Sequence, residues 1–258
     1  MDKKHCPIGF FDSGVGGLSV LRHALTKLPK EDFIYYGDDK NAPYGEKTED
    51  EIRRLSLNCG EFLYNKGVKL IVVACNTATS VSIREMRDIY NIPILSMEPA
   101  VKPALTALEG DGKVLVMATP ATISQKRYNL LLERLNCKDK VINMKCGGLV
   151  ELIEKGDFDA PELEDYLEKK LAPLKGMRID AIVMGCTHYS FVSEHIRNTA
   201  LKYVDGKAEI FDGMYGVVRY LKHTLDETGL ANDSGTGKVE FYSSAQNETA
   251  LYKKLLYM

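Results

Sequence analysis

The sequence predicts an α/β protein of two similar domains, each with a mainly parallel sheet flanked by helices. Apolar, β-branched runs of strand length recur along the chain, and each is followed by a stretch of helical periodicity, as is typical of βα units. One set of such units ends near Glu98, and a second set runs from Lys113 to about Tyr203. The remaining residues are too few for a core of their own, so we expect them to fold back onto the first set.

The expected strands are the most apolar of these runs. They span residues 8–12, 33–37, 70–74, 92–95, 114–118, 141–145, 181–185, 208–211 and 239–242. Between the second and third strands, Thr48 and Glu51 form a capping-box pattern at the start of an amphipathic helix. Cys59 lies on the apolar stripe of that helix and is expected in the core.

This order of units predicts a discontinuous N-terminal domain with a second domain inserted into it. Residues 1–98 plus 208–258 form the first, which carries Asp12 and Cys75, and residues 99–207 form the second, which carries Cys186 and His188. We expect the active site in a cleft between the two domains.

Composition favours a small-molecule partner and excludes several classes of protein. The 258 residues include 34 Lys and Arg against 36 Asp and Glu, so no broad basic field for nucleic acid is expected. The six cysteines show no zinc-type spacing, which argues against a metal. No apolar run is long enough for a signal peptide or a membrane span, which predicts a reducing cytoplasm and free thiols.

Two segments share one construction, in which a buried strand ends in a cysteine that opens a polar turn. Cys75 follows strand 70–74 and precedes Asn76 and Thr77, while Cys186 follows strand 181–185 and precedes Thr187 and His188. Ligands bind at the carboxyl ends of strands in open α/β sheets, so both thiols could face one substrate. Two facing proton carriers are what a cofactor-free racemase needs, although each cysteine alone could be structural.

A glycine-rich turn follows the first strand. Asp12 ends that strand, Ser13 follows it, and the turn offers backbone amides to an anion such as a carboxylate. It lacks the spacing of a nucleotide loop, so a plain tight turn is the alternative. Asp12 has no packing reason to end a buried strand.

Other polar residues admit a functional and a structural interpretation. Tyr44 and Gly45 could close over a ligand or form a surface turn. Thr119 and Thr122 could meet the ligand or cap a helix. Glu154 would by default be a solvated helix charge.

Taken together, the motifs resemble the glutamate racemases, of the cofactor-independent aspartate/glutamate racemase superfamily. The resemblance covers about residues 7 to 241 and rests on four segments in the same order and spacing: Asp12-Ser13-Gly14-Val15-Gly16-Gly17-Leu18, Pro43-Tyr44-Gly45, Ala74-Cys75-Asn76-Thr77 and Gly185-Cys186-Thr187-His188-Tyr189. The family usually continues the last of these with Pro-Leu, whereas Ser190 and Phe191 follow here.

The resemblance implies a cofactor-independent enzyme that interconverts L- and D-glutamate. Cys75 and Cys186 would be the proton carriers, with Asp12 assisting Cys75, and His188 and Glu154 assisting Cys186. The positions that match substrate-holding residues are Asp12, Ser13, Tyr44, Gly45, Asn76, Thr77, Thr119, Thr122, Thr187 and His188. The family supplies D-glutamate for peptidoglycan, and its members commonly form homodimers.

Three alternatives remain open from the residues. A sister racemase acting on aspartate or another amino acid would share every motif. A two-domain solute-binding protein would share the architecture but gain nothing from paired thiols. A cysteine hydrolase or amidotransferase could use Cys186 and His188, and Cys75 would then be dispensable.

Overall fold

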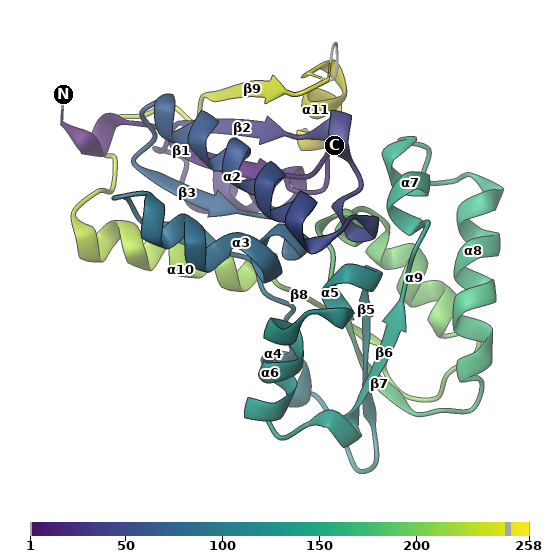
Figure 1. The fold of residues 1–258 in the computed structure, drawn as a ribbon. Coiled ribbons are helices and arrows are strands. Elements are labelled where there is room, and N and C mark those ends of the chain that lie inside the picture. The colour runs from purple at the N-terminus through teal and green to yellow at the C-terminus, as the bar shows by residue number, and fades with distance from the viewer. Residues whose placement is uncertain (1, 246–248, 258) are drawn as a thin grey trace. The chain divides into compact units, whose positions relative to one another are not determined.

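The computed structural model describes residues 2–245 and 249–257, and its chain forms two compact units (Figure 1). The first unit comprises residues Met1–Glu98 and Met214–Met258, and the second comprises Pro99–Gly213. The ends of the expected domain 1–98 plus 208–258, and its residues 246–248, fall outside the described part of the chain. Each unit is treated by itself below.

The first unit is built on a parallel sheet with strand order β4-β3-β1-β2-β9. Its strands are β1 (Ile8–Asp12), β2 (Phe33–Gly37), β3 (Leu70–Val73), β4 (Ile94–Ser96) and β9 (Val239–Ser243). Its helices are α1 (Leu18–Lys27), α2 (Glu49–Asn65), α3 (Asn76–Ile89), α10 (Met214–Thr228) and α11 (Thr249–Leu256), with short 3₁₀ turns η1 (Lys3–His5), η2 (Asp39–Asn41) and η3 (Tyr44–Glu46). Helix α2 packs with α3, and α1 packs with α10 and α11.

The second unit is built on a parallel sheet with strand order β6-β5-β7-β8. Its strands are β5 (Lys113–Ala118), β6 (Val141–Lys145), β7 (Ile179–Met184) and β8 (Glu209–Asp212). Its helices are α4 (Val101–Leu105), α5 (Pro120–Ser124), α6 (Lys126–Arg134), α7 (Leu149–Glu154), α8 (Pro161–Leu171) and α9 (Ser193–Ala200), with 3₁₀ turns η4 (Lys138–Lys140), η5 (Ala172–Leu174) and η6 (Thr187–Val192).

The core of the second unit follows the two-residue period of its strands. Leu115 and Met117 of β5 pack in a cluster with α7, α8 and α9, whereas Val114 and Val116 pack in another with α4 and α6. Successive side chains of a strand point to opposite faces, so a strand covered on both sides must be apolar throughout. This explains the continuous apolar runs of the sequence.

The predicted fold class is confirmed: both sheets are parallel and flanked by helices. One boundary was wrong, because residues 208–213 belong to the second unit. Strand β8 pairs with β7, with Glu209 opposite Ala181, so this edge strand completes the second sheet before the chain returns to the first unit. Strand β4 begins at Ile94 rather than at residue 92, and Pro93 just before it has no N–H to donate to a ladder.

A buried ion pair fastens the returning chain to the first unit. The Lys69 ammonium donates to Glu31 Oε2 at 2.5 Å and to the carbonyls of Lys4 and Leu230 at 2.7 and 2.8 Å. The second Glu31 oxygen accepts from the Asn232 amide at 2.7 Å. Both charged side chains are buried, and their hydrogen bonds join four separate parts of the chain.

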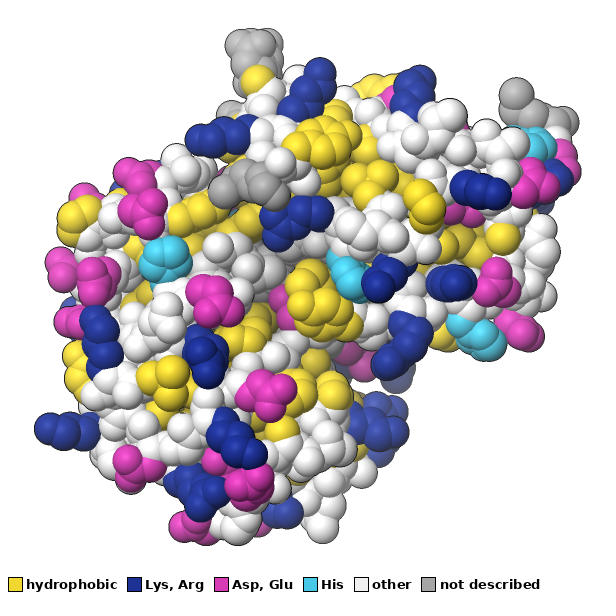
Figure 2. Space-filling model, turned by 180° about the vertical axis from the view of Figure 1, so that it is seen from behind, with side chains coloured by type: hydrophobic (Ala, Val, Ile, Leu, Met, Phe, Trp, Pro, Cys, Tyr) yellow, Lys and Arg dark blue, Asp and Glu magenta, His cyan; other side chains and the backbone are white. Residues whose placement is uncertain are grey.

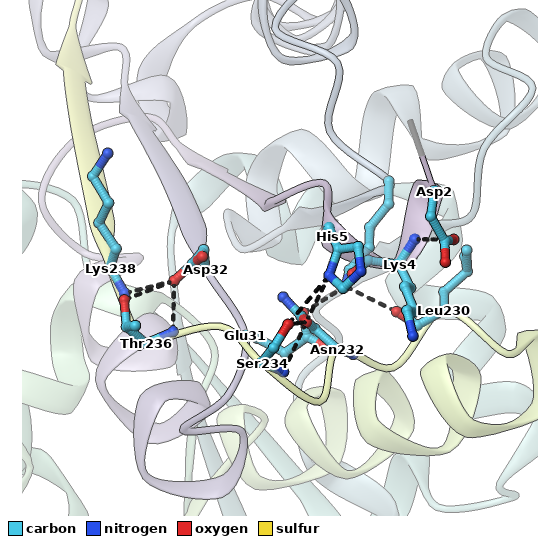
Figure 3. Close-up of polar contacts among 11 residues, drawn as sticks. Asp2, Lys4, His5, Glu31, Asp32, Leu230, Asn232, Ser234, Thr236 and Lys238 are labelled. Carbon is cyan, nitrogen blue, oxygen red and sulfur yellow. Dashed lines mark hydrogen bonds and ion pairs between the residues drawn. The ribbon is translucent and has the colours of Figure 1, made fainter.

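The Asp32 carboxylate, next to Glu31, also binds the segment that precedes β9 (Figure 3). Asp32 Oδ1 accepts from the amides of Thr236 and Lys238 at 3.1 and 2.9 Å. His5 lies 3.2 Å from the Asn232 side chain through its Nδ1 atom. The segment before β9 is therefore held at the amino ends of the strands, which are the ends opposite those that carry Asp12 and Cys75.

The surface agrees with the small net charge. On the face drawn in Figure 2, basic and acidic side chains are interspersed among hydrophobic and neutral ones. Among the described residues, no helix is both long and apolar enough to cross a membrane.

Candidate active site

Cys75 lies where β3 ends and α3 begins, and it is the residue that caps this helix. Its Sγ accepts from the Ala78 amide at 3.4 Å and lies 3.5 Å from the Ser13 hydroxyl oxygen. The side chain is buried. An amide at a helix N-terminus and a hydroxyl are the kinds of group that favour a thiolate over a thiol.

Asp12 lies beside this thiol at the end of β1. Its Oδ1 accepts from the Gly14 amide at 3.1 Å and from the Ser13 hydroxyl at 3.4 Å. Ser13 therefore contacts both the carboxylate and the Cys75 sulfur. The structure thus brings together three residues that the sequence predicted as one site, from the ends of two neighbouring strands.

The residues after Cys75 form the first turn of α3 and are buried. Asn76 and Thr77 are 5% and 3% exposed. Within the described residues the Asn76 Oδ1 atom is buried without a hydrogen-bond partner, an arrangement that costs free energy in the ligand-free protein. An acceptor held in this way is suited to a donor that arrives with a substrate, such as an ammonium group.

Tyr44 and Gly45 lie in η3 and are both buried. The Tyr44 hydroxyl donates to Asp38 Oδ2 at 2.6 Å and lies 3.7 Å from Cys59 Sγ. Because the single hydroxyl hydrogen goes to Asp38, the Cys59 thiol is the donor in the second contact. Burial raises the pKa of Tyr44, and the negative charge of Asp38 raises it further, so its hydroxyl stays a donor.

Asp38 was missed by the sequence interpretation. It is buried directly after β2, accepts from the Asn41 side chain at 2.9 Å as well as from Tyr44, and its backbone amide donates to the Asp12 carbonyl at 3.0 Å. The signal was present, since Asp38, like Asp12, is an acid at the end of a buried strand. The expected place of Cys59 in the core is confirmed.

Thr119 and Thr122 follow β5 in the second unit. Thr119 caps α5, and its Oγ1 accepts from the Thr122 amide at 3.2 Å and donates to the Thr122 hydroxyl at 3.0 Å. The two side chains are buried. The structure thus shows the capping interpretation directly, and a role in binding stays a prediction.

Cys186 follows β7 and faces an imidazole. Its Sγ lies 3.7 Å from His188 Nδ1, and His188 Nε2 lies 2.6 Å from Glu154 Oε1, at the end of α7. His188 is 1% exposed, and the Glu154 side chain is 24% exposed. The Glu154 carboxylate therefore contacts one nitrogen of the His188 ring, and the Cys186 sulfur lies near the other nitrogen.

The environment of His188 favours its charged form. Burial by itself lowers the pKa of an imidazole, but the hydrogen bonds to Cys186 and Glu154 and their negative charges outweigh it, so the pKa of His188 lies well above the ordinary 6.5. A positive imidazolium beside a sulfur stabilises negative charge on that sulfur, and a thiolate is the form in which a cysteine acts as a base.

The two thiols differ in how they are surrounded. A helix amide contacts Cys75, whereas Cys186 precedes the 3₁₀ turn η6 and makes no capping hydrogen bond through its side chain. The α-helix that follows, α9, starts only at Ser193, and His188 occupies the place of the amide donor.

Gly185 sets the path of the chain into Cys186. Its amide donates to the Met117 carbonyl at 2.8 Å, and a Cβ atom here would lie 2.6 Å from the Ala118 Cβ atom. Only glycine allows β7 and β5 to remain this close at their carboxyl ends. The Gly-Cys sequence is therefore a packing requirement as well as a motif.

Metal chemistry finds no support among the described residues. No group of three or more His, Cys, Asp or Glu side chains in this part of the chain is arranged to hold a metal ion. The described cysteines are all free.

Comparison with known proteins identifies the family. A family model described as Asp/Glu/Hydantoin racemase matches residues 13–220. The chain is 47% identical to a glutamate racemase of Clostridium perfringens over 99% of this chain and 98% of that protein. A glutamate racemase of Clostridium novyi is 45% identical, with 98% and 96% covered.

Solved structures of glutamate racemases have the same fold. The glutamate racemase isoform RacE1 of Bacillus anthracis matches with a TM-score of 0.87 at 28% identity, over 99% of this chain and 95% of that chain. The enzyme of Francisella tularensis, solved in complex with D-glutamate, matches with a TM-score of 0.83 at 28% identity, with 99% and 95% covered. The chain belongs to the Asp/Glu/Hydantoin racemase family and, within it, to the glutamate racemases, which are isomerases.

Proposed function

We propose that this chain interconverts L- and D-glutamate without a cofactor, with Cys75 and Cys186 as the two proton carriers. The observation that carries the proposal is that each unit supplies one buried thiol at the carboxyl end of a central strand, with its own polar partners. Those partners are Ser13 and Asp12 for Cys75, and His188 and Glu154 for Cys186.

In one direction, a thiolate removes the α-proton of glutamate. The C–H bond breaks, an S–H bond forms, and the electron pair stays on the α-carbon and its carboxylate. The opposite thiol then gives its proton to the other face, which forms the new C–H bond and leaves a thiolate. The reverse direction starts from that second thiolate, so each cysteine serves once as base and once as acid.

The neighbouring groups keep each carrier in the protonation state that its step needs. The His188 imidazolium stabilises the Cys186 thiolate, and Glu154 orients the ring and keeps its proton. Asp12 acts near Cys75, and the Ser13 hydroxyl lies between them. These assignments follow the resemblance and fit the contacts within each unit.

The weak acidity of the α-proton is the main chemical obstacle. Donors on the α-carboxylate would stabilise the negative charge that develops there in the transition state. We assign this role, and that of holding the amine and the side-chain carboxylate, to the predicted binding set: Asp12, Ser13, Tyr44, Gly45, Asn76, Thr77, Thr119, Thr122, Thr187 and His188. The Francisella tularensis and Escherichia coli enzymes, described in complex with D-glutamate and L-glutamate, support glutamate as the substrate.

The proposal extends to the cellular role. Following the resemblance, D-glutamate made by this enzyme would enter peptidoglycan synthesis, in the cytoplasm. A homodimer is the expected assembly.

Single cysteine variants test the proposal. Cys75→Ala and Cys186→Ala should each abolish racemisation, followed by circular dichroism from either enantiomer, while the fold survives. Cys137→Ala is the matched control and should retain activity, because that thiol is also buried but lies in a hydrophobic cluster, where it donates to the Leu132 carbonyl. Appreciable racemisation by either active-site variant would disprove the two-thiol mechanism.

Isotope exchange and a substrate panel complete the test. In D₂O, deuterium should enter chiefly the product enantiomer, because the acid that donates is not the base that removed the proton. Equal labelling of recovered substrate would indicate a single carrier. Faster racemisation of aspartate than of glutamate would instead assign the chain to a sister activity.

A further inference from the structure

The 3₁₀ turn η6, which follows Cys186, is attached to its surroundings through four consecutive side chains. They reach three parts of the second unit. His188 contacts Glu154 of α7, and Phe191 stacks on Phe158 in the turn after α7. Tyr189 donates to the Cys146 carbonyl, and Ser190 donates to Asp212 of β8.

Such attachment matters because η6 is only six residues long and has 3₁₀ geometry. Hydrogen bonds in 3₁₀ turns are poorer than in α-helices, so the backbone alone holds such a turn weakly. The side-chain contacts must therefore determine where the His188 ring lies relative to the Cys186 sulfur. Three of the four contacts belong to residues that the proposed mechanism does not use: Tyr189, Ser190 and Phe191.

We propose that Ser190 and Phe191 are positioning residues for the Cys186–His188 pair. The proposal rests on the proposed role of Cys186 as a proton carrier.

The first contact ties η6 to the strand beside β7. Asp212 ends β8, where it pairs with Met184, and its side chain is buried. The Ser190 hydroxyl donates to this carboxylate, and a hydrogen bond to a charged acceptor is stronger than a neutral one. Cys186 follows Met184 by two residues, so the bond fixes the turn against the strand pair from which the sulfur projects.

The second contact duplicates the link between η6 and the α7 segment. The rings of Phe191 and Phe158 stack with centroids 5.8 Å apart and an interplanar angle of 16°. Phe158 lies in the turn after α7, four residues beyond Glu154. The stack therefore holds together the same two segments that the bond between His188 and Glu154 joins, and keeps the carboxylate within reach of the ring.

Loss of either contact should affect proton transfer more than binding. A displacement of catalytic groups by about 1 Å can reduce turnover by up to about a hundredfold. We expect Ser190→Ala and Phe191→Ala each to lower kcat about tenfold, with KM close to that of the parent enzyme. The limb of the pH–kcat profile that depends on the protonation of His188 should also shift, because the distance from the imidazole to the thiol changes.

Conservative variants and controls separate positioning from plain stability. Ser190→Thr keeps the hydroxyl and Phe191→Tyr keeps the ring, so both should restore most of kcat. Ser193→Ala removes a hydroxyl from the next helix, and Leu174→Ala removes packing from the same core cluster as Phe158. These two should change the melting temperature at most, with the kcat and pH profile of the parent.

The results for Cys186→Ala show whether the positioning proposal fails or the proposed function fails. If Cys186→Ala abolishes turnover while Ser190→Ala and Phe191→Ala keep the parent kcat and pH profile, the positioning proposal is wrong and the proposed function stands. If Cys186→Ala retains turnover, the proposed function fails first. Should an alanine variant not fold, Phe191→Leu and Ser190→Cys take its place in the same assay, and parent kinetics in both would reject the proposal.

Discussion

His188 and Glu154 form a short polar contact beside Cys186, with 2.6 Å between Nε2 and Oε1. His188 lies in η6 and Glu154 lies in α7, and the two residues are 34 positions apart in the sequence. Because the other ring nitrogen faces Cys186, the charge of this carboxylate acts on the thiol through the imidazole.

The pair should give the second unit a stability that depends on pH. The folded protein holds the His188 proton more tightly than the unfolded chain, where the ordinary pKa is 6.5. The resulting stabilisation is complete below that value and is lost as pH rises through the higher pKa of the folded state. The difference in unfolding free energy between the parent and His188→Asn should therefore shrink toward alkaline pH.

Urea denaturation from about pH 6 to about pH 10 measures that difference. Glu154→Gln removes one of the charges that raise the pKa, so its loss of stability should occur at lower pH than in the parent. A difference that is constant across the range would contradict the assignment.

Asn76→Ala should separate binding from stability. The substitution removes the Oδ1 acceptor, which is buried and has no hydrogen-bond partner among the described residues. Such an atom lowers the free energy of unfolding by about 1–3 kcal/mol. The melting temperature of the ligand-free protein should therefore stay the same or rise, while KM for glutamate increases about tenfold or more. Calorimetry and steady-state kinetics test this together, and a lowered melting temperature with unchanged KM would refute it.

Lys69→Met should destabilise the first unit without touching the active site. The change leaves the Glu31 carboxylate buried without its counter-ion, and two carbonyls lose their donor, which should cost about 3–5 kcal/mol. The double variant Lys69→Met/Glu31→Leu should recover part of that loss. Enzyme that remains folded should keep the parent kcat, because the pair lies at the amino ends of the strands.

Lys238→Met is the control for this prediction. Lys238 forms an exposed ion pair with Glu240 at 2.8 Å, and solvent screening leaves such pairs little effect on stability. Equal losses from Lys69→Met and Lys238→Met in chemical denaturation would show that burial of the first pair does not matter.

Gly185→Ala should impair both folding and turnover. The added Cβ atom would lie 2.6 Å from the Ala118 Cβ atom and 2.7 Å from the Met117 carbonyl oxygen, so the strands must separate, at a cost of about 1–3 kcal/mol. Separation of the strands would also displace Cys186, which follows Gly185 directly, so kcat should fall as well. Gly216→Ala in α10 is the matched control, since outside its own helix no described residue would lie within 4 Å of the new Cβ atom. Alanine in a helix should raise the free energy of unfolding by up to about 1 kcal/mol. Unimpaired kcat in Gly185→Ala would show that this spacing is not needed.

Much of the fold was predictable because its signals are local. The apolar run that became β1 and the Thr48–Glu51 capping box depend on neighbours in sequence, and the structure shows both as expected. The end of the inserted domain was misplaced because β8 is an edge strand that is only partly apolar. Its partner β7 is distant in sequence, and no local pattern reveals which sheet it joins.

The sequence by itself determined that two strands end in cysteines with polar followers, because strand period and turn chemistry are written in adjacent residues. Only the tertiary structure decided which groups reach each sulfur. Packing of parallel strands brings Ser13 to Cys75, and the contact of η6 with α7 brings Glu154 to the imidazole beside Cys186. Those contacts join segments far apart in the chain, and the energy that selects them comes from burial of the sheets and helices that carry them.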